Sequence, residues 1–149
     1  MQRISSMILI SHRGNINGPN PEMENNPEYI QKALDLGYDV EVDVWGTKYG
    51  AWYLGHDDKE YLIDVKFLRQ KGLWCHAKEI RSFYRMVEDP NIHCFAHDRD
   101  FAALTTKGYF WQSWSYQMTK RSICVMPPLS KDVPNYVAGV CSDYIERYK

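Results

Sequence analysis

Seven short runs of apolar and β-branched residues recur along this chain of 149 residues, and polar residues directly follow most of them. Runs of this kind, separated by stretches with helical character, are typical of βα units in a parallel sheet. The runs span residues 7–10, 38–44, 73–75, 92–96, 109–111, 122–126 and 137–141. Seven runs in 149 residues allow about 21 residues (149/7) for each strand and its connection. A full barrel of βα units takes roughly 250 residues in all.

This spacing predicts an α/β fold, a reduced and irregular TIM-type (β/α) barrel of parallel strands with short or missing helices. We expect one domain over residues 1–149, with an open doubly wound sheet as the structural alternative. A helix is predicted over 27–34, because Asn26 is a good N-cap, Pro27 suits the first helical position and Gly37 suits the end. Further helices are predicted over 79–87 and 98–105.

Charge and hydropathy exclude two classes of protein. The 18 basic and 19 acidic residues give a net charge of -1, which argues against a nucleic-acid binder. The apolar run at 7–10 is far shorter than the roughly 20 residues that cross a bilayer, and it is too short for a signal peptide. We therefore expect a cytoplasmic protein whose cysteines are reduced and buried. These cysteines are Cys75, Cys94, Cys124 and Cys141.

The polar residues that follow the apolar runs predict one functional site. Glu41 and Asp43 are two residues apart, so their carboxylates share one face of a strand. In parallel α/β folds the carboxyl ends of the strands form the active face. Each residue has an ordinary structural alternative, such as an N-cap role for Asp98, so the prediction depends on their joint order. The polar residues concerned are His12, Arg13, Glu41, Asp43, His76, Lys78, His97, Asp98 and Asp143.

The order of these motifs resembles the glycerophosphodiester phosphodiesterase family, which belongs to the phospholipase-C-like phosphodiesterase barrels. The motifs are His-Arg-Gly at 12–14, Glu-Asn at 24–25, Glu-x-Asp at 41–43, Thr-Lys-x-Gly at 47–50 and His-Asp at 56–57. His56 follows Asp43 by thirteen residues, as in the family, and Lys78 matches the lysine of a later Glu-x-Lys motif. The N-terminal motifs cover about a third of the chain.

The resemblance implies a metal-dependent phosphoric diester hydrolase of lipid metabolism that acts on a small-molecule phosphodiester. His12 and His56 would be the general acid and base, and Arg13 and Lys78 would bind the substrate phosphate. A divalent ion, Mg²⁺, Mn²⁺, Ca²⁺ or Zn²⁺, would neutralise charge in the transition state. Its ligands would be Glu41, Asp43 and His76, although the family has a carboxylate at the position of His76. Asp98 is the alternative third ligand.

Three other interpretations remain open at this stage. The substitution at His76 and the short segment between His56 and Leu73 favour a weak or inactive member that binds phosphate or phospholipid headgroups. A zinc or iron site built from the cysteines and histidines at 75, 76, 94 and 97 has spacings that match no tight zinc pattern. The aromatic segment 109–116 suggests a lipid-facing surface, with core packing as the alternative. A homodimer would hide exposed aromatic residues.

Overall fold

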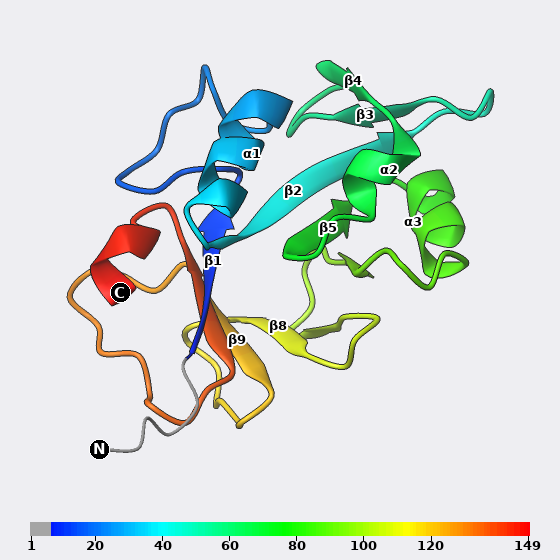
Figure 1. Cartoon of the computed structure of the whole chain (residues 1–149). Coiled ribbons are helices and arrows are strands. Elements are labelled where there is room, and N and C mark those ends of the chain that lie inside the picture. The colour runs from blue at the N-terminus through cyan, green and yellow to red at the C-terminus, as the bar shows by residue number, and fades with distance from the viewer. Residues whose placement is uncertain (1–6) are drawn as a thin grey trace.

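The protein is described by a computed structural model that places residues 7–149, and these residues form one curved, mixed sheet with a few short helices (Figure 1). The strands are β1 (Ile8–His12), β2 (Asp39–Gly46), β3 (Trp52–Leu54), β4 (Tyr61–Ile63), β5 (Leu73–Ala77), β6 (Cys94–Ala96), β7 (Ala103–Leu104), β8 (Phe110–Ser113), β9 (Ser122–Val125) and β10 (Gly139–Ser142). The helices are α1 (Pro27–Asp35), α2 (Val65–Leu68), α3 (Ile80–Val87) and the 3-10 helix η1 (Ile145–Tyr148).

All seven predicted runs are confirmed as strands. They lie in the order β6-β5-β2-β1-β10-β9-β8, and each is parallel to its neighbours. The sequence did not predict β3, β4 and β7, which add antiparallel pairs to this parallel set. The β3–β4 hairpin pairs with the far end of β2, beyond the part of β2 that pairs with β1.

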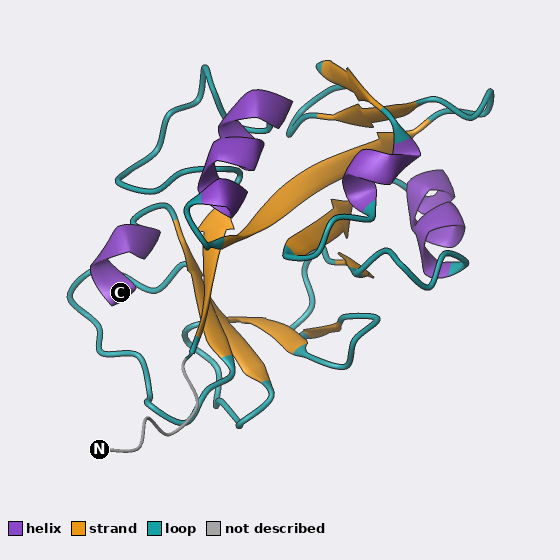
Figure 2. Ribbon diagram, in the orientation of Figure 1, coloured by secondary structure: helices purple, strands orange, loops and turns teal. Residues whose placement is uncertain are grey.

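The expectation of a TIM-type barrel is wrong. The sheet is open and mixed, and among residues 7–149 only three short α-helices are present (Figure 2). The sheet curls until Phe95 of β6 and Trp111 of β8 pack with ring centroids 4.6 Å apart, but no ladder joins these strands. The connection between β6 and β8 is short, and it forms the antiparallel strand β7 instead of a crossover helix, so the barrel does not close.

The two faces of β2 have different chemistry. Val40, Val42 and Val44 are fully buried in an apolar cluster with residues of α1, α2 and α3. The intervening Glu41 and Asp43 point to the opposite, concave face, because side chains alternate along a strand. Deep in the concave face lies a second apolar cluster, rich in aromatic residues. Its members are Ile10, Trp74, Phe95, Ala103, Trp111, Ile123 and Cys141.

Two of the three helices predicted from the sequence are confirmed, and the third is wrong. In α1, the Asn26 side chain accepts a hydrogen bond from the Glu28 amide, as expected of an N-cap. Helix α3 forms where it was predicted, but Ile80 and Tyr84 are more than 60% exposed, whereas Met86 is buried. The predicted helix over 98–105 is wrong, since this segment is a loop followed by β7.

Two further predictions concern the cysteines and membranes. The four cysteines are all buried and free, as predicted. Trp111 is 3% exposed, which favours core packing over a lipid-facing role for that residue. Among the residues placed by the structure, no helix combines the length and the hydropathy needed to cross a bilayer.

His93 gives the fold a predicted sensitivity to acid. Burial, assisted by the charge of Lys107, lowers the pKa of His93 to about 4, and its Nε2 lies 2.8 Å from Thr105 Oγ1. Only the neutral ring suits this environment, so stability is present above the unfolded-state pKa of about 6.5 and is lost as the pH falls toward 4. We expect wild type to lose roughly 3 kcal/mol more than His93→Gln over that range in urea titrations with chelator. Equal losses in both proteins would contradict this prediction.

Candidate functional site

Strand register brings the predicted polar residues together on the concave face. His12 of β1 lies beside Glu41 of β2, and Asp43 lies beside His76 of β5. Asp143 directly follows β10, which pairs with β1 on its other side. Three adjacent parallel strands and the end of a fourth therefore deliver these side chains to one rim, at the carboxyl end of the strands, as the sequence predicted.

Glu41, Asp43 and His76 form the centre of the site. One potential ligand atom from each residue lies within 4.8 Å of the others. Glu41 and Asp43 are almost entirely buried, and the side chain of His76 is 14% exposed. Two carboxylates and one imidazole are a donor set that could hold Mn²⁺ or Zn²⁺ more readily than Ca²⁺, which prefers oxygen ligands only.

The orientation of the His76 ring fits a cation at this position. Its Nε2 lies 3.2 Å from the backbone oxygen of His97, and a carbonyl can only accept, so Nε2 carries a proton. Its Nδ1 points toward Asp43 Oδ1 at 3.2 Å and Glu41 Oε2 at 3.6 Å. A bare Nδ1 would direct a lone pair at two carboxylates, so either a proton or a metal ion must lie on that nitrogen.

The pKa values of His76 and Asp43 also indicate that this site favours positive charge. Burial alone would lower the pKa of His76, but the hydrogen bonds and charges of Asp43 and Glu41 raise it to about 9. Burial alone would raise the pKa of Asp43, but His76, Arg13 and Asn25 together lower it to about 2. In the absence of a metal, His76 is therefore an imidazolium held by the two carboxylates.

Glu41 has an unsatisfied oxygen that also fits a metal site. Its buried Oε1 has no hydrogen-bond partner within residues 7–149, although His12 Nε2 lies 3.9 Å away. An unpaired buried carboxylate oxygen is costly, and buried charges normally pair or bind metals. The surroundings hold four carboxylates against one permanent cation, Arg13. The four are Glu24, Glu41, Asp43 and Asp143.

Arg13 is fixed in place beside the carboxylates. Its Nε lies 3.1 Å from Asp43 Oδ2 and its Nη1 lies 3.2 Å from Glu24 Oε1. Burial opposes the charge, but these carboxylates and Glu41 raise the pKa of Arg13. Its backbone is in the left-handed region at φ 58°, a conformation that non-glycine residues adopt at some cost. The neighbouring Asn25, at φ 68°, donates from its side chain to Asp43 Oδ2.

His12 forms a hydrogen-bonded dyad with Asp143. The His12 Nδ1 atom lies 2.8 Å from Asp143 Oδ1, so Nδ1 carries a proton and donates it to the carboxylate. Burial would lower the pKa of His12, but Asp143 and Glu41 raise it overall. Nε2 is left to exchange protons next to the metal-ligand cluster, which is the arrangement of a general base oriented by a carboxylate.

The other predicted residues lie outside the central cluster of Glu41, Asp43 and His76. His56 follows Gly55, whose amide donates to the Asp43 carbonyl at 3.1 Å. Its side chain is 43% exposed, and its Nδ1 lies 2.8 Å from Asp57 Oδ1. Lys78 lines a separate pocket of about 280 Å³ together with Asp98 and other residues. Asp98 is exposed, so His76 and not Asp98 completes the cluster.

Sequence reasoning missed several residues of the site. Asp143 was noted only as a polar residue after the last strand, and Asn25 only as part of a motif. Their roles depend on contacts between distant segments, since His12 and Asp143 are 131 positions apart. The signal available in the sequence was the strand-end position of Asp143. The zinc or iron site is wrong, because Cys75 packs on the helix-covered face, away from His76.

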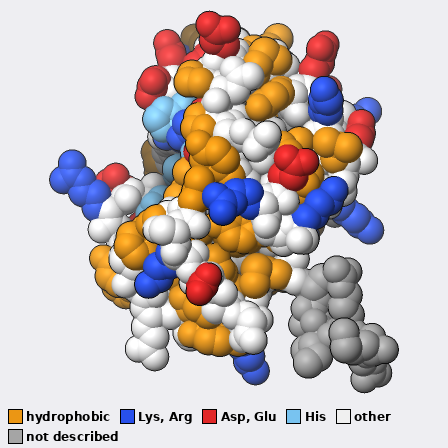
Figure 3. All heavy atoms as spheres, turned by 90° about the vertical axis from the view of Figure 1, so that its left-hand side faces the viewer, with side chains coloured by type: hydrophobic (Ala, Val, Ile, Leu, Met, Phe, Trp, Pro, Cys, Tyr) orange, Lys and Arg blue, Asp and Glu red, His pale blue; other side chains and the backbone are white. Residues whose placement is uncertain are grey.

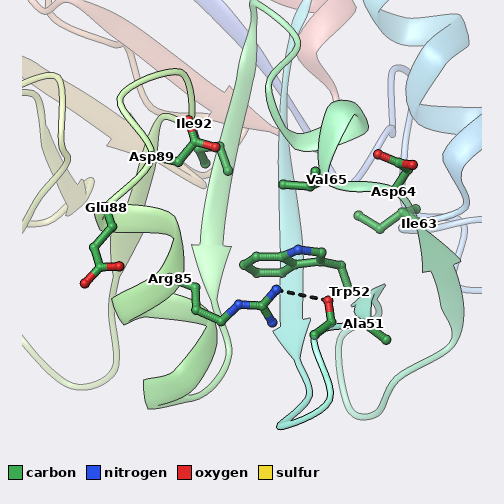
Figure 4. A pocket seen from close by; sticks show the side chains of 10 residues that line it. Ala51, Trp52, Ile63, Asp64, Val65, Arg85, Glu88, Asp89 and Ile92 are labelled. Atoms are coloured by element: carbon green, nitrogen blue, oxygen red, sulfur yellow. Dashed lines mark hydrogen bonds between the residues drawn. The ribbon is translucent and has the colours of Figure 1, made fainter.

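A pocket of about 550 Å³ lies away from this site, between the β3–β4 hairpin, α2 and α3 (Figure 4). The Arg85 guanidinium lies 3.9 Å from the Trp52 ring centroid and donates to the Gly50 carbonyl at 3.0 Å. Two of the acidic groups on the rim already have partners, because Asp64 caps α2 and Asp89 pairs with Arg69, and the third, Glu88, is exposed.

On the face drawn in Figure 3, acidic and basic side chains are interspersed, and histidine side chains reach the surface at one edge.

Comparison of the chain with protein-family models, with curated proteins and with solved structures gave no significant match. The geometry of the site itself is therefore the main indication of function.

Proposed function

We propose that the protein is a metal-dependent hydrolase of phosphodiesters. The observation that carries this proposal is the position of the His12–Asp143 dyad beside the buried group of Glu41, Asp43 and His76. An oriented base next to a candidate metal site is the combination that phosphodiester hydrolysis needs. The motif order at 12–14, 41–43 and 56 supports the same reaction by resemblance.

The residues have separate tasks in this reaction. A divalent cation held by Glu41, Asp43 and His76 would supply positive charge to the phosphoryl oxygens. His12 accepts a proton from the attacking hydroxyl at Nε2, while Asp143 holds its Nδ1 proton and stabilises the imidazolium that forms. Arg13 contributes a fixed charge for the substrate phosphate.

His56 is the proposed general acid. Its Nδ1 pairs with the Asp57 carboxylate, which would stabilise an imidazolium, and in that form its Nε2 would donate a proton to the leaving alkoxide. Lys78 is the proposed second phosphate contact, and it follows His76 by two positions in the chain. The resemblance implies that both residues take part, and His56 is assigned as the acid because His12 is assigned as the base.

The test is hydrolysis of a bis-aryl phosphate and of glycerophosphodiesters by the purified chain with Mg²⁺, Mn²⁺, Ca²⁺ or Zn²⁺. Turnover that requires the metal and is lost in Glu41→Gln is the expected result. Inactivity with every metal would overturn the proposal.

Metal binding has a separate predicted effect on stability. At a metal concentration a hundred times Kd, binding stabilises the fold by about 2.7 kcal/mol, which raises Tm by roughly 5–10 °C. Glu41→Gln removes a ligand and is expected to lose this rise, whereas the exposed Asp98→Asn is expected to keep it. Thermal unfolding with and without chelator measures both effects. A rise of equal size in Glu41→Gln would show that the ion binds elsewhere.

The alternative function is binding of phosphate or a phospholipid headgroup without turnover. The exposure of His56 favours this alternative, since a general acid must be held at the leaving group. Calorimetric titration with inorganic phosphate, in the metal-loaded protein, would show binding where the hydrolysis assay shows none.

The proposal extends to the cellular location and the binding partners of the protein. The four free, buried cysteines fit a cytoplasmic location, where thiols stay reduced. The near-balanced charge fits a small-molecule substrate better than a nucleic acid. The homodimer stays a prediction.

A further inference from the structure

A chain of hydrogen bonds runs from His12 to two residues that have no part in the proposed chemistry. The Asp143 Oδ1 atom, which accepts from His12 Nδ1, also accepts from Asn15 Nδ2 at 2.9 Å. The other end of the Asn15 amide, Oδ1, accepts from the Tyr29 hydroxyl at 2.9 Å. Four side chains from three separate segments are thus linked in series.

The direction of every hydrogen bond in this chain is determined. The Asp143 carboxylate can only accept, so the amide nitrogen of Asn15 must face it. The Asn15 oxygen then faces Tyr29, whose hydroxyl must donate. The one arrangement that satisfies every group therefore leaves the His12 proton on Nδ1.

The surrounding structure holds the chain in place. Asn15 is fully buried, and the Asp143 carbonyl accepts from the Gly18 amide at 2.8 Å. The Tyr29 ring, on α1, packs against Gly14, which has φ 98° and leaves no room for a Cβ atom there. Helix α1 therefore positions the hydroxyl that orients Asn15.

We propose that Asn15 and Tyr29 are positioning residues, which hold Asp143 so that His12 stays in the tautomer with Nδ1 protonated and Nε2 free. The consequence for catalysis rests on the proposed function, but the consequence for the tautomer does not. Without the Asn15 amide, Asp143 Oδ1 loses one of its two side-chain donors and the carboxylate is free to rotate. His12 then loses its fixed acceptor and populates both tautomers.

The test measures the His12 tautomer by imidazole ¹H–¹⁵N spectra of the metal-free protein, with His12→Gln used to assign the signals. At a pH where the His12 ring is neutral, wild type is expected to show one tautomer, with the proton on Nδ1. Asn15→Ala and Tyr29→Phe are expected to show a mixture. Tyr84→Phe removes an exposed hydroxyl on α3 and is the matched control, expected to match wild type. Tyr29→Phe keeps the ring against Gly14, so it tests the chain even where Asn15→Ala folds poorly.

Kinetics give the second readout. We expect kcat for the bis-aryl phosphate to fall about tenfold in Asn15→Ala, with a smaller fall in Tyr29→Phe and with KM changed less than twofold. Folded variants that keep both the wild-type tautomer and the wild-type kcat would overturn the positioning role. An inactive wild type would refute the proposed hydrolase instead, and the tautomer comparison alone would then decide the positioning role.

Discussion

Replacing His12 with Gln is expected to lower kcat for a phosphodiester by about 10²–10⁴-fold, the usual contribution of a positioned general base. Gln has nearly the size of His but cannot take a proton from the attacking hydroxyl. KM is expected to change little, because Arg13 and the metal ligands, which would bind the substrate phosphate, are untouched. Steady-state kinetics with saturating metal measure both constants.

His97→Gln is the matched control for this prediction. The His97 side chain pairs with Asp100 at 2.7 Å, and its ring centroid lies 6.0 Å from that of His76, whose Nε2 contacts the His97 backbone carbonyl. This variant is expected to retain wild-type turnover, and both variants are expected to retain the metal-induced rise in Tm. Full activity in His12→Gln would remove His12 from the reaction and favour the binding function.

The sequence predicted the parallel strands well, because each is a short apolar run that folding must bury. It could not predict how the sheet ends. The run at 73–75 and the pair Ala103–Leu104 are both short, yet β5 lies inside the parallel set and β7 forms an antiparallel edge. Which neighbour a strand pairs with depends on long-range contacts that no local pattern encodes.

Helix α3 shows a second limit of periodicity. Ile80, Phe83, Tyr84 and Val87 recur at helical spacing, and the pattern alone predicts that this side is buried. In the structure Phe83 packs against the apolar cluster, but the other three are exposed, and the buried residues of α3 are Ser82 and Met86. The Glu79 carboxylate accepts from the Gly46 and Ser82 amides, so a polar cap helps to fix the rotation of the helix.

The candidate site likewise contains some features that the sequence predicts and others that depend on long-range contacts. Glu41 and Asp43 were predictable because one strand carries both, and strand alternation places them on one face. The Asp143 contact with His12 was not predictable, since it needs β10 to lie beside β1. His76 was identified by its position in the motif, but its orientation depends on the His97 carbonyl of the next strand segment.

The affinity of the site for a metal is expected to increase with pH up to about pH 9, because His76 must exchange a proton for the ion. Its Nε2 proton is held by the His97 carbonyl, so the ion and the second proton compete for Nδ1. The pKa of His76 is raised to about 9, so below that pH each unit of acidity weakens binding about tenfold. Isothermal titration in buffers of different ionisation enthalpy should show about one proton released per ion at pH 7.5.

His76→Asp provides the sharpest contrast, since it places a carboxylate where the resembled family has one. The variant has no imidazole proton to displace, and an aspartate with ordinary pKa is ionised throughout the neutral range. Its metal affinity is therefore expected to be nearly independent of pH between 7 and 9, while that of wild type changes about a hundredfold. The variant should also shift preference toward Mg²⁺ and Ca²⁺, which favour oxygen ligands. A wild-type affinity that is equally flat would mean that Nδ1 of His76 is not a ligand, and that Glu41 and Asp43 hold the ion without it.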